Sequence, residues 1–274
     1  MSWPETKTVL VTVRTYPTPA TKGVEVSCTA GITEDGRWIR LFPIPYRYLP
    51  TAQRFRKYQW IKAAVRRSSD SRPESYEIDV NSIQLLSEPL PERNAWEERK
   101  RHVLRLLAPS LCALKRAWQA DKQGAATLGI FRPRRILRLR IEPTTPAWSP
   151  KQLAALRQYE NALIPDPRTP RQELEKVPFN FKYVFQCDDD ACKTHTLGCT
   201  DWEASEAWRS WRRYGSAWEQ KFRQKFETWM TEKRDTHFYV GTVHEHPAEW
   251  MIVGLFYPPK HREQQPALPG LEAN

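Results

Sequence analysis

Glycine is scarce in this sequence, with only 10 glycines in 274 residues. A phosphate-binding loop needs several glycines close together, so the sequence excludes a glycine-rich nucleotide-binding motif. Long hydrophobic runs are missing as well. The longest apolar stretches, such as residues 251–256, are far shorter than the about 20 residues that span a membrane as a helix. The sequence therefore predicts no membrane partner.

Cysteine is also infrequent, and the five cysteines are an odd number. The chain runs from Met1 directly into a strand-like segment that does not have the pattern of a signal peptide. A secreted disulfide framework would favour an even number of cysteines. These features predict a protein of the reducing cytoplasm.

Aromatic residues, proline and positive charge are abundant. Aromatic residues make up 12% of the chain, with 12 Trp, and such residues need burial or stacking partners, so the chain folds. The 23 prolines are expected to set the turns. The 43 Lys and Arg residues against 32 Asp and Glu give a formal charge of +11. This excess favours partners that carry negative charge.

Short strands dominate the first third of the chain. Val9, Val11 and Val13 alternate within residues 7–16, as in a half-buried strand. Asp35-Gly36 marks a hairpin tip between strands at 24–32 and 37–44. Further strands are expected at 58–66 and, more weakly, at 81–87. This pattern predicts a small β-barrel domain over residues 1–90.

The remaining chain alternates between helices and strands. Residues 91–128 are expected to form a helical connector whose helices are interrupted at Pro109. Residues 129–257 are expected to form a second β domain. Strands are expected at 135–141, 179–187, 193–199, 237–243 and 250–257. In the first of these, Leu137, Leu139 and Ile141 are expected to share one face. A short helix is expected at 151–160, and residues 258–274 have little to bury and are expected to be a flexible tail.

One long helix is expected at residues 201–231, with Asp201 as its N-cap. Its large aromatic residues recur at three- and four-residue intervals, which favours a stripe that faces the core. The stripe consists of Trp208, Trp211, Trp218, Phe222, Phe226 and Trp229.

Two successive sets of about five strands resemble a tandem pair of oligonucleotide-binding (OB) barrels. The segment from Cys28 to Leu41, Cys-Thr-Ala-Gly-Ile-Thr-Glu-Asp-Gly-Arg-Trp-Ile-Arg-Leu, is similar to a hairpin of the dual-OB-containing domain proteins of bacteria. The resemblance implies an α+β fold of two small OB-like β-barrels with helical insertions. It also implies nucleic-acid binding without catalysis, as an accessory component of a mobile-element or defence system.

Three thiols and one imidazole lie within thirteen residues. Cys187, Cys192, His195 and Cys199 have the spacing Cys-x4-Cys-x2-His-x3-Cys. Three thiolates and a neutral imidazole are a common structural zinc set, so a zinc staple is predicted. The alternative is a group of ordinary reduced thiols. Cys112 lies in an apolar helix and reads as an inert thiol.

Basic and aromatic residues alternate in three places. Cations neutralise phosphates and aromatic rings stack on bases, so this pairing is typical of nucleic-acid binding. The candidate residues are Arg37, Trp38, Arg40, Arg54, Arg56, Lys57, Arg132, Arg134, Arg138 and Arg140. The alternative is a solvated charged face with its aromatic side chains inside. DNA and RNA are equally compatible with the pattern.

Two other functions remain open. Asp188, Asp189, Asp190, Asp201 and Glu203 near His195, and the segment His244-Glu245-His246, offer the ligands of a divalent-metal nuclease. However, no nuclease signature accompanies them. A subunit that serves protein interactions within a larger complex is the other alternative.

Overall fold

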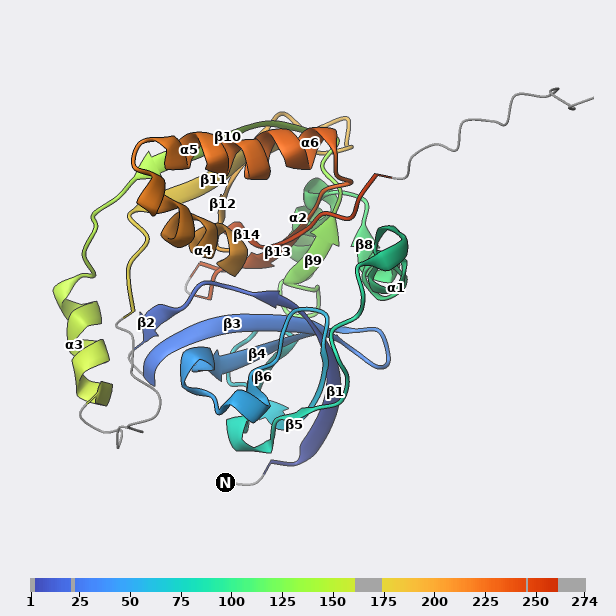
Figure 1. The fold of residues 1–274 in the computed structure, drawn as a ribbon. Coiled ribbons are helices and arrows are strands. Elements are labelled where there is room, and N and C mark those ends of the chain that lie inside the picture. Colours follow the sequence, from blue (N-terminus) through green and yellow to red (C-terminus); the bar gives the residue numbers. More distant parts are fainter. Residues whose placement is uncertain (1–2, 21–22, 161–173, 245, 261–274) are drawn as a thin grey trace, which may run out of the picture.

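In the computed structural model, residues 3–20, 23–160, 174–244 and 246–260 are described. The chain forms two β-sheet units that lie one above the other, with most helices on their outer sides (Figure 1). The fold is therefore α+β. Within the described residues, no helix is both long enough and apolar enough to cross a membrane.

The first unit is a closed five-stranded barrel. Hydrogen bonds link its strands in the order β1-β3-β4-β6-β5, and a second pairing of β1 with β5 closes the ring. Strands β4 and β6 are parallel, whereas the other pairs of the ring are antiparallel. The bounds are β1 (Glu5–Arg14), β3 (Gly23–Thr33), β4 (Trp38–Ile44), β5 (Trp60–Arg67) and β6 (Ser75–Ile78), with short strands β2 (Thr18–Ala20) and β7 (Gln84–Leu85) attached.

The predicted barrel is confirmed, but its fifth strand was wrongly placed. Residues 81–87 form the end of a 3-10 turn (η3, Val80–Ser82) and the two-residue strand β7. The strand that completes the barrel is β6, whose four residues are too short to show an alternating pattern. Other turns of this unit are η1 (Tyr46–Tyr48) and η2 (Thr51–Gln53), between β4 and β5.

The second unit is a seven-stranded sheet in the order β10-β11-β12-β14-β13-β9-β8. Strands β12 and β14 are parallel, as β4 and β6 are in the barrel. The bounds are β8 (Leu107–Ala108), β9 (Leu128–Phe131), β10 (Arg135–Pro143), β11 (Phe179–Gln186), β12 (His195–Cys199), β13 (His237–Thr242) and β14 (Trp250–Phe256). Only residues 132–134 separate β9 from β10, so the chain itself joins these two distant strands of the sheet.

Strand β10 contains a β-bulge, so its side chains do not alternate regularly as the sequence predicts. Its pairing with β11 shifts between Ile136 and Arg138, so Leu137 is the extra residue. The expected alternation places Leu137 on the core side with Leu139. Because a bulge reverses the direction of the side chains that precede it, Ile136 packs against the core and Leu137 is 40% exposed.

The expected long helix is divided into two arms. Helix α4 (Trp202–Trp211) leads through a 3-10 turn (η5, Arg212–Tyr214) to Gly215, whose φ of +57° ends the helix. The second arm consists of α5 (Ala217–Arg223), the π-helical turn η6 (Gln224–Trp229) and α6 (Met230–Glu232). The aromatic stripe therefore lies on two arms that pack against each other over the second sheet (Figure 1).

The expected N-cap of α4 is confirmed, since the carboxylate of Asp201 accepts a hydrogen bond from the backbone N–H of Glu203. The two predicted helices around Pro109 are also present. They are α1 (Arg93–Val103) and α2 (Leu111–Ala120), separated by a 3-10 turn (η4, Leu104–Leu106) and β8. Helix α3 (Pro150–Glu160) lies beside β2 and β3 of the barrel (Figure 1).

Parts of three segments considered in the sequence lie outside the described residues. They are residues 161–173, after the helix expected at 151–160, Glu245 of the segment His244-Glu245-His246, and residues 261–274 of the expected tail.

The two units share a hydrophobic core. Leu10 and Tyr58 of the barrel pack with Tyr239 and Phe256 of the second sheet, and Trp96 of α1 joins them. These side chains are all at least nine-tenths buried. Since burial of apolar surface stabilises contacts without directional requirements, this core holds the units against each other.

Candidate metal centre and cationic surface

Three cysteines and one histidine converge at the edge of the second unit. The ligand atoms of Cys112, Cys187, Cys192 and His195 all lie within 4.8 Å of one another. Four ligands around zinc, at about 2.3 Å for sulfur, would be about 3.8 Å apart in a tetrahedron. A small contraction would therefore bring these atoms to bonding distance. We call these four residues the metal cluster, and it could hold a metal ion.

Two elements supply the ligands. Cys187 follows the last residue of β11 and His195 begins β12, so the hairpin between these strands carries three of the four residues, including Cys192. Within the turn of this hairpin, the backbone N–H of Cys187 donates a hydrogen bond to Cys192 Sγ at 3.2 Å. Cys112 comes from α2, and its Sγ lies 3.1 Å from His195 Nε2. The cluster therefore joins a helix to a hairpin.

Asp189 positions the helix that carries Cys112. Its carboxylate accepts a hydrogen bond from Ser110 Oγ at 3.3 Å and pairs with Arg116 at 2.7 Å. Ser110 is also the N-cap of α2, because its hydroxyl accepts from the backbone N–H of Ala113. These contacts tie α2, which carries Cys112, to the turn that carries Cys192.

The protonation of the cluster depends on its burial. Burial, followed by the neighbouring thiols of Cys187 and Cys192, raises the pKa of Cys112 to about 12. Burial also raises the pKa of Cys187 and lowers that of His195. The imidazole is thus kept neutral, which is its ligand form, whereas the thiols of Cys112 and Cys187 need a bound cation to become thiolates.

Cys199 does not belong to the cluster, contrary to the expectation from sequence spacing. Cys199 and His195 lie four residues apart on the extended strand β12, and an extended chain advances about 3.3 Å per residue. Their Cα atoms are therefore about 13 Å apart, too far for one ion. Cys112 is the ligand that the sequence analysis missed. It lies 75 residues before Cys187 in the chain, and no local spacing links the two.

Two of the expected nucleic-acid contacts point into the protein and correct the sequence-based expectation: Arg40 is buried, and the side chain of Lys57 is only 11% exposed. Arg40 is 3% exposed and lies 3.6 Å from the carboxylate of Glu74. The Lys57 ammonium lies 3.0 Å from Glu203 and 3.4 Å from Asp201 at the start of α4. A buried cation needs an opposite charge beside it, so these two join parts of the protein instead of facing a ligand.

Two other cations of the barrel are exposed but paired. Arg37 pairs with Asp35 on the hairpin, and Arg56 pairs with Glu88 at 2.6 Å. Arg54 uses its guanidinium within the protein, where it donates to the backbone carbonyls of Leu49 and Arg47. The first unit therefore offers few free positive charges among the expected contacts.

Trp38 packs within the protein as well. Its ring contacts that of Tyr239 in an edge-to-face arrangement, with centroids 6.1 Å apart, in the core between the units. It is half-buried and lines a cleft of about 510 Å³ together with Arg37. Tryptophan at this position thus has a packing role.

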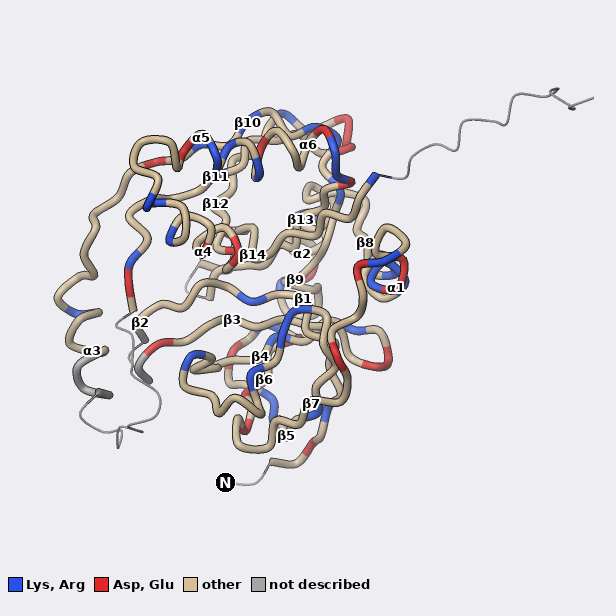
Figure 2. The backbone as a smooth tube through the Cα atoms, viewed as in Figure 1, with Lys and Arg blue, Asp and Glu red and all other residues tan. Residues whose placement is uncertain are grey.

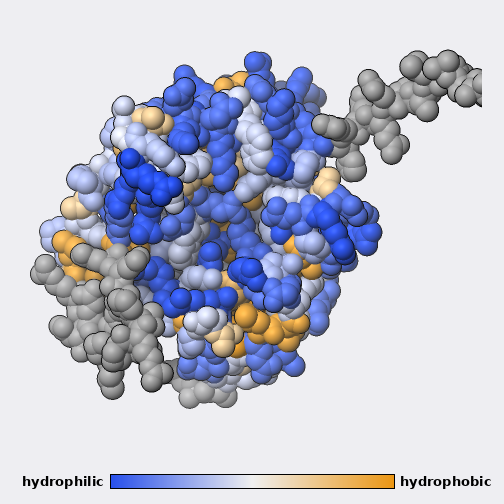
Figure 3. Space-filling view, in the orientation of Figure 1, coloured by the Kyte–Doolittle hydropathy of each residue, from blue (hydrophilic) through white to orange (hydrophobic). Residues whose placement is uncertain are grey.

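The second unit presents unpaired arginines. Arg134, Arg138 and Arg140 are exposed, and within the described residues no carboxylate pairs with any of them. Arg132 pairs with Asp235 at 2.7 Å. Figure 2 shows blue segments along β10 and α5, on the side of the molecule away from the barrel. Figure 3 shows that hydrophilic residues prevail over the helices on this half.

A cationic pocket adjoins these arginines. Its volume is about 330 Å³, and it lies between the β9–β10 link and the end of α6. Five cationic residues and one acidic residue, Asp235, line it. The cationic residues are Arg132, Arg134, Arg135, Arg234 and Lys260. Like charges this close repel one another, so the pocket favours an anion.

The acidic residues considered for a nuclease are dispersed. Asp201 and Glu203 pair with Lys57, and Asp189 pairs with Arg116. His244 Nδ1 lies 3.3 Å from Asp70, which also pairs with Arg72. Within the described residues, the metal cluster is the group of at least three such ligands that converges on one point.

Two family models match this chain. One, described as Domain of unknown function (DUF8757), matches residues 107–269, more than half of the chain. The chain belongs to the DUF8757 family. A second, Domain of unknown function (DUF8758), matches residues 5–105. No curated protein matches the sequence.

The two matches correspond to the two units of the fold. The DUF8758 match covers the strands of the closed barrel, and the DUF8757 match begins with β8, the first strand of the second sheet. All four residues of the metal cluster lie in the DUF8757 region, as do the arginines of β10. The connector predicted at 91–128 contains the boundary between the two.

Proposed function

We propose that this protein binds nucleic acid without cleaving it, through the positive surface of its second unit. The observation that carries the proposal is the exposed group of Arg134, Arg138 and Arg140, which lack carboxylate partners in the described chain. Arg134 also lines the cationic pocket. Because phosphates release bound counterions when they meet such cations, this surface suits a polyanion.

The topology supports the OB resemblance. In the barrel, β1 pairs with β5 through its first half and with β3 through its second. In the second unit, β9 pairs with β13 and the following β10 pairs with β11, in the same relation. Each unit has an inserted segment after its third main strand, η1–η2 in one and α4–α6 in the other. A closed five-stranded barrel and a second sheet that repeats its order of main strands suit a tandem OB pair.

The proposed surface is smaller than the sequence analysis predicts. Arg40 is buried, Lys57 is mostly enclosed and paired with Asp201, and Arg37 and Arg56 are paired, so the barrel contributes little. Paired exposed charges attract phosphate less strongly, because their carboxylates offset the field. We therefore assign the principal contacts to the second unit.

Fluorescence anisotropy with a labelled oligonucleotide at several salt concentrations tests this proposal. The wild-type affinity is expected to fall steeply with salt. Replacing Arg138 and Arg140 by Ala is expected to weaken binding and to lower the slope of log K against log salt by about one for each phosphate that is no longer neutralised. The matched control replaces the paired Arg37 and Arg56 by Ala and leaves the slope nearly unchanged. Affinity that does not change with salt would refute the proposal.

We further propose that the metal cluster holds a structural zinc ion. Three thiols and a neutral imidazole form a closed set of four ligands, which leaves no position for a catalytic water. Elemental analysis of protein purified without added metal is expected to find one zinc per chain. Cys112→Ser is expected to lose the zinc, whereas Cys199→Ser is expected to retain it. Zinc retained by both variants, or absent from the wild type, would contradict this assignment.

The alternatives receive less support from the geometry. A nuclease would need free carboxylates around a divalent ion, yet Asp201 and Glu203 neutralise Lys57. Degradation of labelled DNA or RNA with Mg²⁺ would nevertheless favour that alternative. The accessory role in a mobile-element or defence system stays a prediction.

A further inference from the structure

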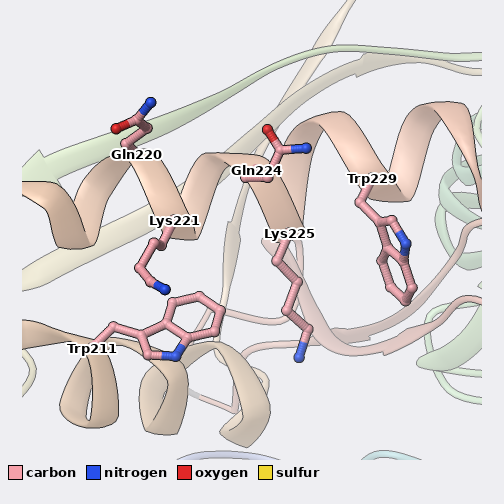
Figure 4. Close-up of a pocket in the computed structure, with 6 residues that line it drawn as sticks. All are labelled: Trp211, Gln220, Lys221, Gln224, Lys225 and Trp229. Carbon is pink, nitrogen blue, oxygen red and sulfur yellow. The ribbon is translucent and has the colours of Figure 1, made fainter.

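A groove with a volume of about 590 Å³ runs between the two helical arms of the second unit. Trp211 projects into it from α4, and Lys221, Lys225 and Trp229 project toward the same side from α5 and η6 (Figure 4). Gln220 and Gln224 complete its lining. The walls of the groove are mostly apolar, because two indole rings form much of them.

The groove is electrically suited to an aromatic anion. Among the described residues, no carboxylate lines it, and its two charged residues are lysines. Nucleic acids combine flat aromatic rings with negative charge, and indole rings stack well on bases of every type. An acidic peptide would also find positive charge here, but it would offer fewer flat rings to the two indoles.

The groove adjoins the cationic pocket of the proposed phosphate surface through one contact. The guanidinium of Arg234 stacks on the ring of Trp229, 3.9 Å from its centroid. Trp229 lines the groove, and Arg234 lines the cationic pocket. A strand whose phosphates lie at the pocket can therefore place a neighbouring base against Trp229.

We infer that this groove holds unstacked bases of a single strand, so that the protein prefers single-stranded nucleic acid. The inference rests on the proposed nucleic-acid binding and adds the class of strand. Trp211 and Trp229 would stack on the bases, and Lys221 and Lys225 would contact the adjoining phosphates. Paired bases in a duplex are stacked on their neighbours and cannot enter.

Competition between oligonucleotides of equal length tests this inference on the wild-type chain. An oligothymidylate and an oligonucleotide with abasic sites carry the same number of phosphates, so they differ only in their bases. We expect the abasic strand to bind at least about 5-fold more weakly, and duplex to compete less well than single strand at equal nucleotide concentration. Equal binding of intact and abasic strands would overturn the inference, whereas failure of every oligonucleotide to bind would overturn the proposed function itself.

Two variants locate the effect in the groove. Trp211→Leu is expected to reduce the ratio between intact and abasic affinities toward one. Trp218→Leu is the matched control, because Trp218 is a half-buried indole of the facing helical arm that packs on Phe179 and does not line the groove. The control is expected to keep the wild-type ratio. An unchanged ratio in folded Trp211→Leu protein would place the bases elsewhere, and the wild-type comparison decides the inference if that variant does not fold.

Discussion

Replacement of Lys57 by Met is expected to weaken the join between the two units. Lys57 belongs to the barrel, and its ammonium reaches Asp201, Glu203 and the backbone carbonyl of Leu255, at 3.4, 3.0 and 3.4 Å. The side chain of Asp201 is 1% exposed, so the substitution leaves a buried carboxylate without its cation. Methionine retains most of the volume, and the change therefore removes charge with little loss of packing.

The size of the effect follows from these contacts. Removing one partner of a buried ion pair costs about 3–5 kcal/mol. Asp201 keeps two backbone N–H donors, at 2.7 Å from Glu203 and 3.0 Å from Leu255, and the side chain of Glu203 is 37% exposed. Both features reduce the penalty. We therefore expect a loss of about 3 kcal/mol in the free energy of unfolding, or roughly 6–12 °C in Tm.

Urea and thermal unfolding of the purified variants would measure this loss. The exposed Lys62→Met serves as the control and is expected to change stability by less than about 0.5 kcal/mol. Adding Asp201→Asn to Lys57→Met removes the unpaired charge and keeps an N-cap. The double variant is therefore expected to regain part of the lost stability. A loss below about 1 kcal/mol for Lys57→Met would refute the reasoning.

The same variant has an expected pH dependence. Burial alone would raise the pKa of Glu203, but Lys57 and the hydroxyl of Tyr257 lower it from 4.5 to about 2. A lowered carboxyl pKa contributes stability above pH 4.5 that is lost as the pH falls toward 2. The difference in the free energy of unfolding between wild type and Lys57→Met is therefore expected to shrink as the pH falls from 4.5 toward 2.

Three further perturbations test other parts of the fold. Gly31→Ala would place a Cβ 2.5 Å from the carbonyl oxygen of Leu10 in the adjacent strand. Chemical unfolding is expected to show a loss of about 1–3 kcal/mol in the free energy of unfolding. A variant as stable as wild type would contradict this close approach. Burial raises the pKa of Glu25 from 4.5 to about 7, against the opposing effect of Arg47, so charging this group costs stability as the pH rises through that interval. Glu25→Gln is accordingly expected to become more stable relative to wild type as the pH rises from about 5 to about 8. A difference in the free energy of unfolding that stays constant with pH would contradict the raised pKa of Glu25. Removal of the proposed zinc with a chelator is expected to lower Tm in a calorimetric scan, because metal binding contributes to folding, and addition of zinc should restore it.

The sequence by itself determined most strands and three of the four cluster residues. Alternation of valines predicted β1, and the Asp35-Gly36 tip predicted the hairpin of β3 and β4. Cys187, Cys192 and His195 were found because they lie on one short hairpin. Such features depend on neighbours within a few residues, which periodicity and spacing report directly.

Only the tertiary structure decided which distant residues meet. Cys112 replaced Cys199 in the cluster because a helix from another part of the chain packs beside the hairpin, whereas a strand carries Cys199 away. Lys57 became an internal partner of Asp201, 144 residues away, and not a surface cation. The reason is physical: the fate of a charge or a thiol depends on which groups surround it after burial, and contacts between distant segments leave no regular spacing in the sequence.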